Sequence, residues 1–358
     1  MIDIDASMGE GGGQIVRSSL ALAACTGAAI ALRNIRAHRD HPGLRAQHLA
    51  AVRAAAVICG ARTAGANVAS RDLLFEPGAV RPGRYEVDVG TAGSTMLVLQ
   101  TILPALSLCS APSEILLHGG THNPRAPTFE FVRDSYLPLL ERLGFKAQIT
   151  LQRHGFFPRG GGAVRALIEP VRRGCALELI ERGAVRTRSA TVLLSGLPEH
   201  IAQREIGTVR ARLGLPEHSC NVQNVTAHGA GNVVHVRIDC TNVTAVFAGF
   251  GARGVPAERV AAEVAAEVEW YLEANVAVDA HLADQLLLPL ALAAGGSFST
   301  LRPTAHTETN AAVIHKFLPI DYETSPLGPE RWAIAVRPRS AAARSGGTHV
   351  QATLGRST

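Results

Sequence analysis

Residues 10–24, EGGGQIVRSSLALAA, decide the fold that we expect for this chain. Three consecutive glycines lead to Gln14, and the apolar run behind it predicts a helix over 15–25. Glycines at a helix start leave backbone N–H groups open, which suits a phosphate group. The stretch lacks the Lys-Ser/Thr of a Walker loop and the spaced glycines of a Rossmann turn, so a plain tight turn is an equal alternative.

The same pattern returns twice further along the chain. Gln100 opens QTILPALSL and Gln285 opens QLLLPLALAA, and a proline (Pro104, Pro289) follows each glutamine four residues later. A proline there removes a helical amide and bends the helix. The bend serves either packing or the opening of the helix start toward a ligand.

Each glutamine segment begins a longer unit, in which the first helix is followed by a short strand, a polar loop and a second helix. The expected strands cover 31–35, 114–118 and 297–301, and the expected second helices cover 42–59, 127–143 and 309–317. We therefore predict an α/β (α+β) fold in which three repeated βα units form one large domain.

A segment of different character interrupts the repeats at 183–275. Its strand-like and helical stretches predict a small inserted α+β domain, with strands at 187–194, 221–227, 232–238 and 243–248 and helices at 198–213 and 256–275. The large domain then covers 1–182 and 276–339. Residues 340–358 are rich in Ser, Ala, Gly, Thr and Arg, and we expect a poorly ordered tail.

The composition excludes several classes of protein. With 47% hydrophobic and 18% charged residues the chain can bury a core, and its net charge of +5 favours an anionic partner such as nucleic acid or a nucleotide. Six cysteines without a Cys-x-x-Cys pair argue against a zinc site and fit reduced thiols in the cytoplasm. The longest apolar run, 286–294, is too short to span a bilayer, so we expect no membrane association.

The third unit contains the residues best suited to covalent chemistry. His306 lies in the polar loop before the expected second helix, and Asp284 and Gln285 open the first. In a compact unit the histidine would face a carboxylate and an amide. A histidine in that position can be a nucleophile, a general base or a metal ligand, whereas a lone loop histidine is more often simply solvated.

The first unit has a loop with two arginines. Arg36 and Arg39 bracket it as a phosphate clamp would, although a solvated basic loop is an equal alternative. His48 shares a helical face with Leu44 and Val52, so a buried core histidine is at least as plausible there as a catalytic one.

Taken in order, these stretches of sequence resemble the RNA 3'-terminal phosphate cyclase family. The matching runs extend from about residue 9 to residue 317: GEGGGQIVRSSLALA, NIRAHRDHPGLRAQHL, GTAGST with LVLQTILPAL, LHGGTHNP with AP, HGFFPRGGG, HLADQLLLPLALA and AHTETN. The resemblance implies three repeated α/β units and an inserted domain of thioredoxin-like topology. It also implies that ATP transfers AMP to a histidine, that AMP moves to the 3'-phosphate of RNA, and that the 2'-hydroxyl displaces it to leave a 2',3'-cyclic phosphate.

The resemblance also assigns roles to residues. His306 matches the histidine that takes AMP, Asp284 would orient it, and Glu10 would bind Mg²⁺ or Mn²⁺. The implied ATP site comprises Gln100, Pro127, Phe250, His281, Leu282, Ala283, Asp284 and Gln285. The implied RNA-phosphate site comprises Arg17, Arg36, Arg39, Gln47 and His48. The loop with His38, Asp40 and His41 departs from the small residues usual in the family, which bears on affinity and pH dependence.

Three other classes of protein share parts of this pattern. A non-catalytic relative of the cyclases would lack His306 and the HLADQ run at 281–285, and both are present. An enolpyruvyl-transferase-like enzyme is also built from α/β repeats, but it needs neither the histidine loop nor the two-arginine loop. A plain RNA-binding protein is disfavoured because aromatic residues make up only 4% of the chain.

Overall fold

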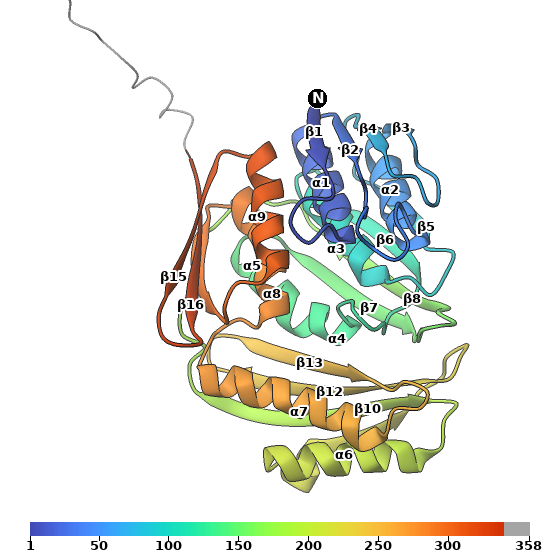
Figure 1. Ribbon diagram of the computed structural model, residues 1–358, viewed down its shortest axis with the longest axis vertical. Coiled ribbons are helices and arrows are strands. Elements are labelled where there is room, and N and C mark those ends of the chain that lie inside the picture. Colours follow the sequence, from blue (N-terminus) through green and yellow to red (C-terminus); the bar gives the residue numbers. More distant parts are fainter. Residues whose placement is uncertain (340–358) are drawn as a thin grey trace, which may run out of the picture.

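The structure is a computed structural model that describes residues 1–339 (Figure 1). The tail predicted for 340–358 lies outside the described residues. Four sheets of four strands each are formed by the described part of the chain. Three of these sheets and their helices make up the upper body in Figure 1, and the fourth lies below it. The predicted α/β class is confirmed.

The three upper sheets share one topology. Each unit runs β-α-β-α-β-β, and its strands lie in the order first, second, fourth, third. The first strand pairs parallel to the second, and the remaining pairings are antiparallel. The prediction of three repeated units from the three glutamine segments is therefore confirmed.

The elements of the units have the following bounds. The first unit contains β1 (Ile2–Asp5), α1 (Gly13–Thr26), β2 (Ile30–Arg33), α2 (Ala46–Cys59), β3 (Arg62–Ala64) and β4 (Leu73–Glu76). The second contains β5 (Arg84–Asp88), α3 (Thr95–Ser107), β6 (Ser113–Gly119), α4 (Phe129–Phe131), the π-helical turn η1 (Val132–Tyr136), α5 (Leu137–Arg142), β7 (Ala147–Arg153) and β8 (Gly162–Ile168). The third contains β9 (Leu177–Leu179), α8 (Ala280–Leu292), β14 (Gly296–Thr300), α9 (Ala305–Phe317), β15 (Ile320–Pro326) and β16 (Trp332–Pro338).

The fourth sheet interrupts the third unit between β9 and α8. Its elements are β10 (Val185–Ser195), α6 (Glu199–Leu213), the 3₁₀ turn η2 (Glu217–Ser219), β11 (Cys220–Asn224), β12 (Gly231–Cys240), β13 (Thr244–Phe250) and α7 (Ala257–Ala274). The strand order is β11-β10-β12-β13, in which only β10 and β11 are parallel. Helices α6 and α7 pack together on one face, while β13 contacts α4 and η1 of the upper body (Figure 1). We propose that residues 183–275 form an inserted domain on this basis.

Several predicted boundaries were wrong for local reasons. Helix α2 begins at Ala46 rather than at 42, because Gly43 adopts a left-handed backbone with φ +80°. Helix α9 begins at Ala305 rather than at 309, since the Thr304 hydroxyl accepts a hydrogen bond from the Thr307 amide and caps it. Strand β11 starts one residue earlier, and ends three residues earlier, than the strand predicted at 221–227. Strand β3 is short and fully exposed and β15 is largely exposed, and neither was predicted. Strand β7 was also not predicted, although Ala147, Ile149 and Leu151 alternate with polar residues along it.

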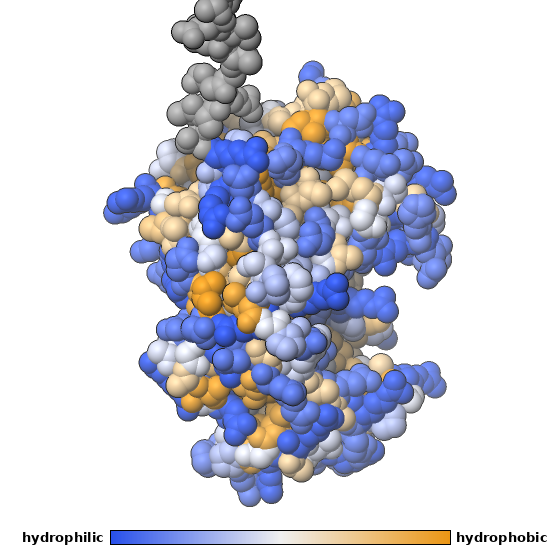
Figure 2. Space-filling view, turned by 60° about the vertical axis from the view of Figure 1, so that its left-hand side comes forward, coloured by the Kyte–Doolittle hydropathy of each residue, from blue (hydrophilic) through white to orange (hydrophobic). Residues whose placement is uncertain are grey.

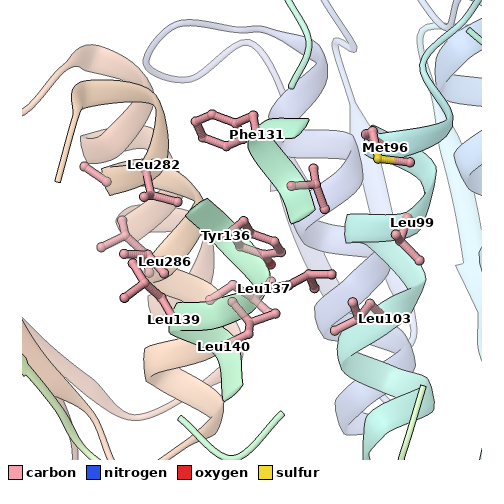
Figure 3. Close-up of a cluster of buried hydrophobic side chains, with 14 of the residues drawn as sticks. Met96, Leu99, Leu103, Phe131, Tyr136, Leu137, Leu139, Leu140, Leu282 and Leu286 are labelled. Carbon is pink, nitrogen blue, oxygen red and sulfur yellow. The ribbon is translucent and has the colours of Figure 1, made fainter. Parts of the chain in front are cut away.

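The core is concentrated where the repeated helices meet. Leu99 and Leu103 of α3 face η1 and α5, which present Tyr136 and Leu140, and Leu286 of α8 closes the cluster from the other side (Figure 3). All five side chains are buried. This packing fixes the relative positions of the first helices of the second and third units, and those helices surround the site described next.

The surface of the molecule is mostly polar on the face shown in Figure 2, where hydrophobic side chains form only small, separate patches. Among the helices of residues 1–339, none combines the length and apolar character needed to cross a lipid bilayer.

Candidate active site

The three repeated glutamines meet at one cavity of about 470 Å³. Gln14, Gln100 and Gln285 all line it, and the Gln100 side-chain amide donates a hydrogen bond to Gln285 Oε1. Pro104 and Pro289 also line this cavity from within α3 and α8. The prediction that glutamine opens these two helices was wrong, because α3 begins at Thr95 and α8 at Ala280. Pro104 and Pro289 therefore line the cavity from the later part of each helix and not from its start.

His306 projects into this cavity from the first turn of α9. Its side chain is 51% exposed, so the ring can be reached from outside. Ring atom Nδ1 lies 2.9 Å from Gln14 Oε1 and 2.5 Å from Glu10 Oε2. These two contacts fix the ring through Nδ1, and they leave Nε2 for a reaction partner.

The charge state of His306 favours nucleophilic chemistry. Burial lowers the pKa of His306 below its ordinary value; Glu10 opposes this shift, and the positive charges of Arg17 and Arg39 reinforce it. The imidazole is thus neutral near neutral pH, and a neutral ring nitrogen retains the lone pair that attack requires.

Glu10 is held beside His306 by close packing of the glycine loop. A Cβ on Gly9 would lie 2.1 Å from Thr309 Oγ1, and that hydroxyl accepts a hydrogen bond of 3.1 Å from the Glu10 amide. Arg39 pairs with Glu10 Oε1 and donates a second bond of 3.2 Å to the Glu10 carbonyl. The glycine run is therefore a tight turn that also delivers a carboxylate to the histidine.

The chemistry of Glu10 fits one ligand of a divalent metal. Its Oε2 is buried and, although close to His306 Nδ1, lacks a hydrogen-bond donor in good geometry. Mg²⁺ in nucleotide sites takes one or two carboxylates together with substrate phosphates, so a single glutamate is enough.

Asp284 lies near His306 and is linked to it through Gln14, so its predicted role in orienting the imidazole stays a prediction. Its Oδ2 accepts a hydrogen bond of 3.1 Å from Gln14 Nε2, and Gln14 in turn contacts His306. Burial raises the pKa of Asp284 to about 7, although His281 and Arg17 counteract this. The carboxyl, the amide and the imidazole thus form a relay from α8 through α1 to α9.

Most residues predicted for an ATP site line the same cavity. Gln100, Pro127, Phe250, His281, Asp284 and Gln285 do so, from four separate parts of the chain. Leu282 and Ala283 do not, because they occupy the opposite side of α8, where both are buried in the core. Five consecutive helical residues cannot all face one cavity, so any contact of Leu282 and Ala283 with a nucleotide would have to come from their backbone, and their assignment to the ATP site stays a prediction.

Only some of the residues predicted to bind the RNA phosphate lie at the cavity or beside His306. Arg17 lines the cavity, where burial lowers its pKa to about 10 and leaves it cationic. Arg39 lies at Glu10, beside His306. Arg36 instead bonds the carbonyls of its own loop, at 2.7 Å and 3.1 Å. Gln47 pairs with the Ser94 backbone at the start of α3, so both of these side chains position loops around the site.

His48 lies directly beneath the glycine turn. A Cβ on Gly13 would lie only 2.1 Å from His48 Nε2, and His48 Nδ1 accepts a hydrogen bond of 3.1 Å from the Arg45 amide. Burial lowers the pKa of His48 to about 3, and neighbouring Arg17 adds to this, so the ring is neutral. The histidine therefore supports the turn from below in the structure described.

Two residues that form contacts in the site were not among those predicted from the sequence. Gln14 bridges Asp284 and His306, and Asn310 donates to the Asp284 carbonyl at 2.7 Å and accepts from Ser18 at 2.7 Å. The signal for Gln14 was available, because it stands at the repeat position of two glutamines that were included. Asn310 had no such signal.

The fold and the site together define an α/β protein of three repeated units with a neutral, reachable histidine at their common cavity. Residues 8–324 match the family described as RTC, RNA 3'-terminal phosphate cyclase. The chain belongs to this family of enzymes.

Two curated relatives agree with this assignment. The RNA 3'-terminal phosphate cyclase of Koribacter versatilis is 47% identical over 326 residues, which cover 91% of this chain and 92% of that protein. The RNA 3'-terminal phosphate cyclase of Pseudomonas fluorescens is 46% identical over 331 residues, covering 92% and 96%. A solved enolpyruvyl transferase, NikO from Streptomyces tendae, aligns at 12% identity over 93% of this chain and 47% of that one. Its TM-score of 0.35 is too low to support a conclusion.

Proposed function

We propose that this protein converts the 3'-terminal phosphate of RNA to a 2',3'-cyclic phosphate at the expense of ATP. The names of its relatives supply the reaction class, and the observation that carries the proposal is His306 itself. It is a neutral imidazole, bound through Nδ1 and half exposed in a cavity large enough for a nucleotide.

In the first step His306 Nε2 attacks the α-phosphorus of ATP. A nitrogen–phosphorus bond forms, the bond from the α-phosphorus to the bridging oxygen breaks, and pyrophosphate leaves. Gln14 and Glu10 contact Nδ1, so they stabilise the positive charge that develops on the ring. Arg17 and Arg39 place two cationic groups near the histidine, and we assign these to the RNA terminal phosphate that enters in the second step.

In the second step an oxygen of the RNA 3'-phosphate attacks the phosphorus of the bound AMP, and the bond to His306 breaks. The adjacent 2'-hydroxyl then attacks the terminal phosphorus, loses its proton, and expels AMP. Once the end carries AMP as a leaving group, ring closure depends mainly on positioning and charge neutralisation.

The cavity suits the adenosine part of ATP. Phe250 and Pro127 offer apolar contacts, while Gln100, Gln285 and His281 offer hydrogen-bonding groups on other walls. Glu10 is the residue that would hold a divalent cation, which would neutralise phosphate charge.

We further propose a cytoplasmic location, where a reducing environment keeps thiols free. The six cysteines are all unpaired in the described part of the chain.

The proposal is tested with a short RNA that bears a 3'-phosphate, incubated with ATP and Mg²⁺. We expect a product resistant to phosphatase, and no product with His306→Ala or with an RNA that has a 3'-hydroxyl. A 2'-deoxy terminal nucleotide should accept AMP without cyclising. Cyclic product formed by His306→Ala at the wild-type rate would refute the assignment.

A further inference from the structure

A second group of histidines lies away from His306, where the upper body meets the fourth sheet. His122 belongs to the loop between β6 and α4, Glu130 to α4, and His235 to the middle of β12. Both histidines are buried and the glutamate is largely so. The proposed reaction uses none of the three.

The three side chains point at one another. Glu130 Oε2 lies 2.9 Å from His122 Nε2 and 3.3 Å from His235 Nε2, and all three atoms lie within 4.8 Å of one another. Nitrogen and oxygen ligands at 2.0–2.1 Å from a tetrahedral Zn²⁺ are separated by about 3.3 Å. The two distances from Glu130 Oε2 are close to this value, and the limit of 4.8 Å on the remaining pair leaves all three atoms within reach of one cation.

Hydrogen bonding within the protein does not satisfy this group. The Glu130–His122 contact has hydrogen-bond geometry, but His235 Nε2 is buried and has no hydrogen-bond partner among the described residues. A buried, unpaired imidazole nitrogen that points at a carboxylate is costly unless a proton or a cation lies between them.

The surroundings resemble the outer contacts of a metal site. His122 Nδ1 lies 2.8 Å from Thr121 Oγ1, so the hydroxyl can fix the ring by accepting its N–H. Phe156, Leu193 and Val233 form a small hydrophobic cluster close by, and the Phe156 ring lies 5.3 Å from the His122 ring. Such apolar packing shields the site from bulk solvent and strengthens binding of a cation by its ligands.

We propose that His122 Nε2, His235 Nε2 and a Glu130 carboxylate oxygen bind one Zn²⁺-type cation. The prediction that cysteine spacing argues against zinc does not apply, because this site contains no cysteine. Two imidazoles and one carboxylate make up a known zinc ligand set, with the fourth position left to water.

The proposed cation would join two parts of the chain. His122 and Glu130 come from the second unit, and His235 comes from the inserted sheet, where an ion pair of 2.8 Å between Asp134 and Arg237 already links the same two parts. His235 is paired in register with Ala248 of β13, and Ala248 lines the cavity at His306. A bound cation would therefore stabilise the wall of the active-site cavity that the inserted sheet supplies.

The test measures zinc bound to the full-length protein after treatment with a chelator and dialysis against Zn²⁺. We expect one equivalent per chain, retained in His306→Ala, which removes the histidine of the active site. His235→Gln should lower the affinity at least about 100-fold. The matched control is His154→Phe, because His154 stacks on His122 at 5.5 Å but contributes no ligand atom. It should bind zinc as the wild type does.

Two results would overturn the proposal: no stoichiometric zinc in the folded wild-type protein, or equal affinity in His235→Gln and the wild type. The second outcome would mean that zinc binds elsewhere. If His235→Gln fails to fold by circular dichroism, Co²⁺ added to the wild type decides the question. Intense tetrahedral absorption, unchanged in His306→Ala, supports the site, and the weak spectrum of hexahydrated Co²⁺ contradicts it.

Discussion

Gln14 Oε1 lies 2.9 Å from His306 Nδ1, although 292 residues separate them in the chain. The same amide donates its N–H to Asp284, so one glutamine contacts both an acid and the histidine. Because α1 and α8 occupy equivalent positions in the first and third units, the repeat itself brings Gln14 to the site. The contact gives a structural reason for the reactivity proposed for His306.

Gln14→Met should slow transfer of AMP to the protein by about 10–100-fold, because it removes the hydrogen bonds that orient His306. ATP affinity should change much less, since the methionine keeps the volume of the side chain. The measurement is single-turnover labelling with radioactive ATP. Gln152→Met is the matched control, as Gln152 is exposed on β7. An equal loss in ATP binding and in labelling would contradict the orienting role.

Arg39→Ala should reduce turnover of a 3'-phosphate RNA by about 10–100-fold, the cost of losing a charge-assisted hydrogen bond. Formation of the protein–AMP adduct should fall less. Separate assays of adduct formation and of AMP transfer to RNA distinguish the two steps. Arg33→Ala serves as control, since Arg33 forms only an exposed ion pair with Asp3. Equal losses in both steps would assign Arg39 to the ATP site instead.

Gly13→Ala should destabilise the protein by about 1–3 kcal/mol, because the new Cβ would overlap His48, which must move. Gly207→Ala is the control. It adds the same methyl group at a helical position of α6 with nothing within 4 Å, and should stabilise the protein by about 0.5–1 kcal/mol. Urea unfolding gives both values. A neutral Gly13→Ala would show that His48 does not rest against the turn.

Glu205→Gln should stabilise the protein in a pH-dependent way. Glu205 is buried in α6 and accepts a hydrogen bond from Asn232, yet burial raises its pKa to about 7. Between its ordinary pKa and 7 the folded state keeps a proton that the unfolded state has lost. The wild type therefore loses stability as pH rises through this window.

The glutamine keeps the hydrogen bond and cannot ionise. The variant should exceed the wild type by about 2 kcal/mol in free energy of unfolding near pH 8, and match it near pH 4.5. Denaturant titrations at both pH values measure this difference. A stabilisation of the same size at both would mean that the ionisation of Glu205 is not its cause.

The sequence was sufficient for the repeat and for part of the site. The apolar stretches that follow the three glutamines predicted α1, α3 and α8, although α3 and α8 begin five residues before Gln100 and Gln285. Strand β7 was not predicted, although its alternation of apolar and polar residues was present in the sequence. The start of α9 depends on the Thr304 cap, which only the backbone geometry reveals.

Contacts between units were beyond sequence reasoning. Nothing along the chain indicates that Glu10 and Gln14 contact the ring that Asp284 was expected to orient. Likewise, His122 and His235 lie close together only because β12 lies against the loop before α4. These pairings follow from the three-dimensional arrangement of separate sheets, which local patterns do not encode.

The central claim is that His306 carries AMP, and intact mass spectrometry tests it directly. The protein is incubated with ATP and Mg²⁺ in the absence of RNA, beside His306→Ala. We expect an acid-labile mass increase of one AMP in the wild type and none in the variant. An adduct of equal yield in His306→Ala, or no adduct in a wild-type protein shown to bind ATP, would contradict it.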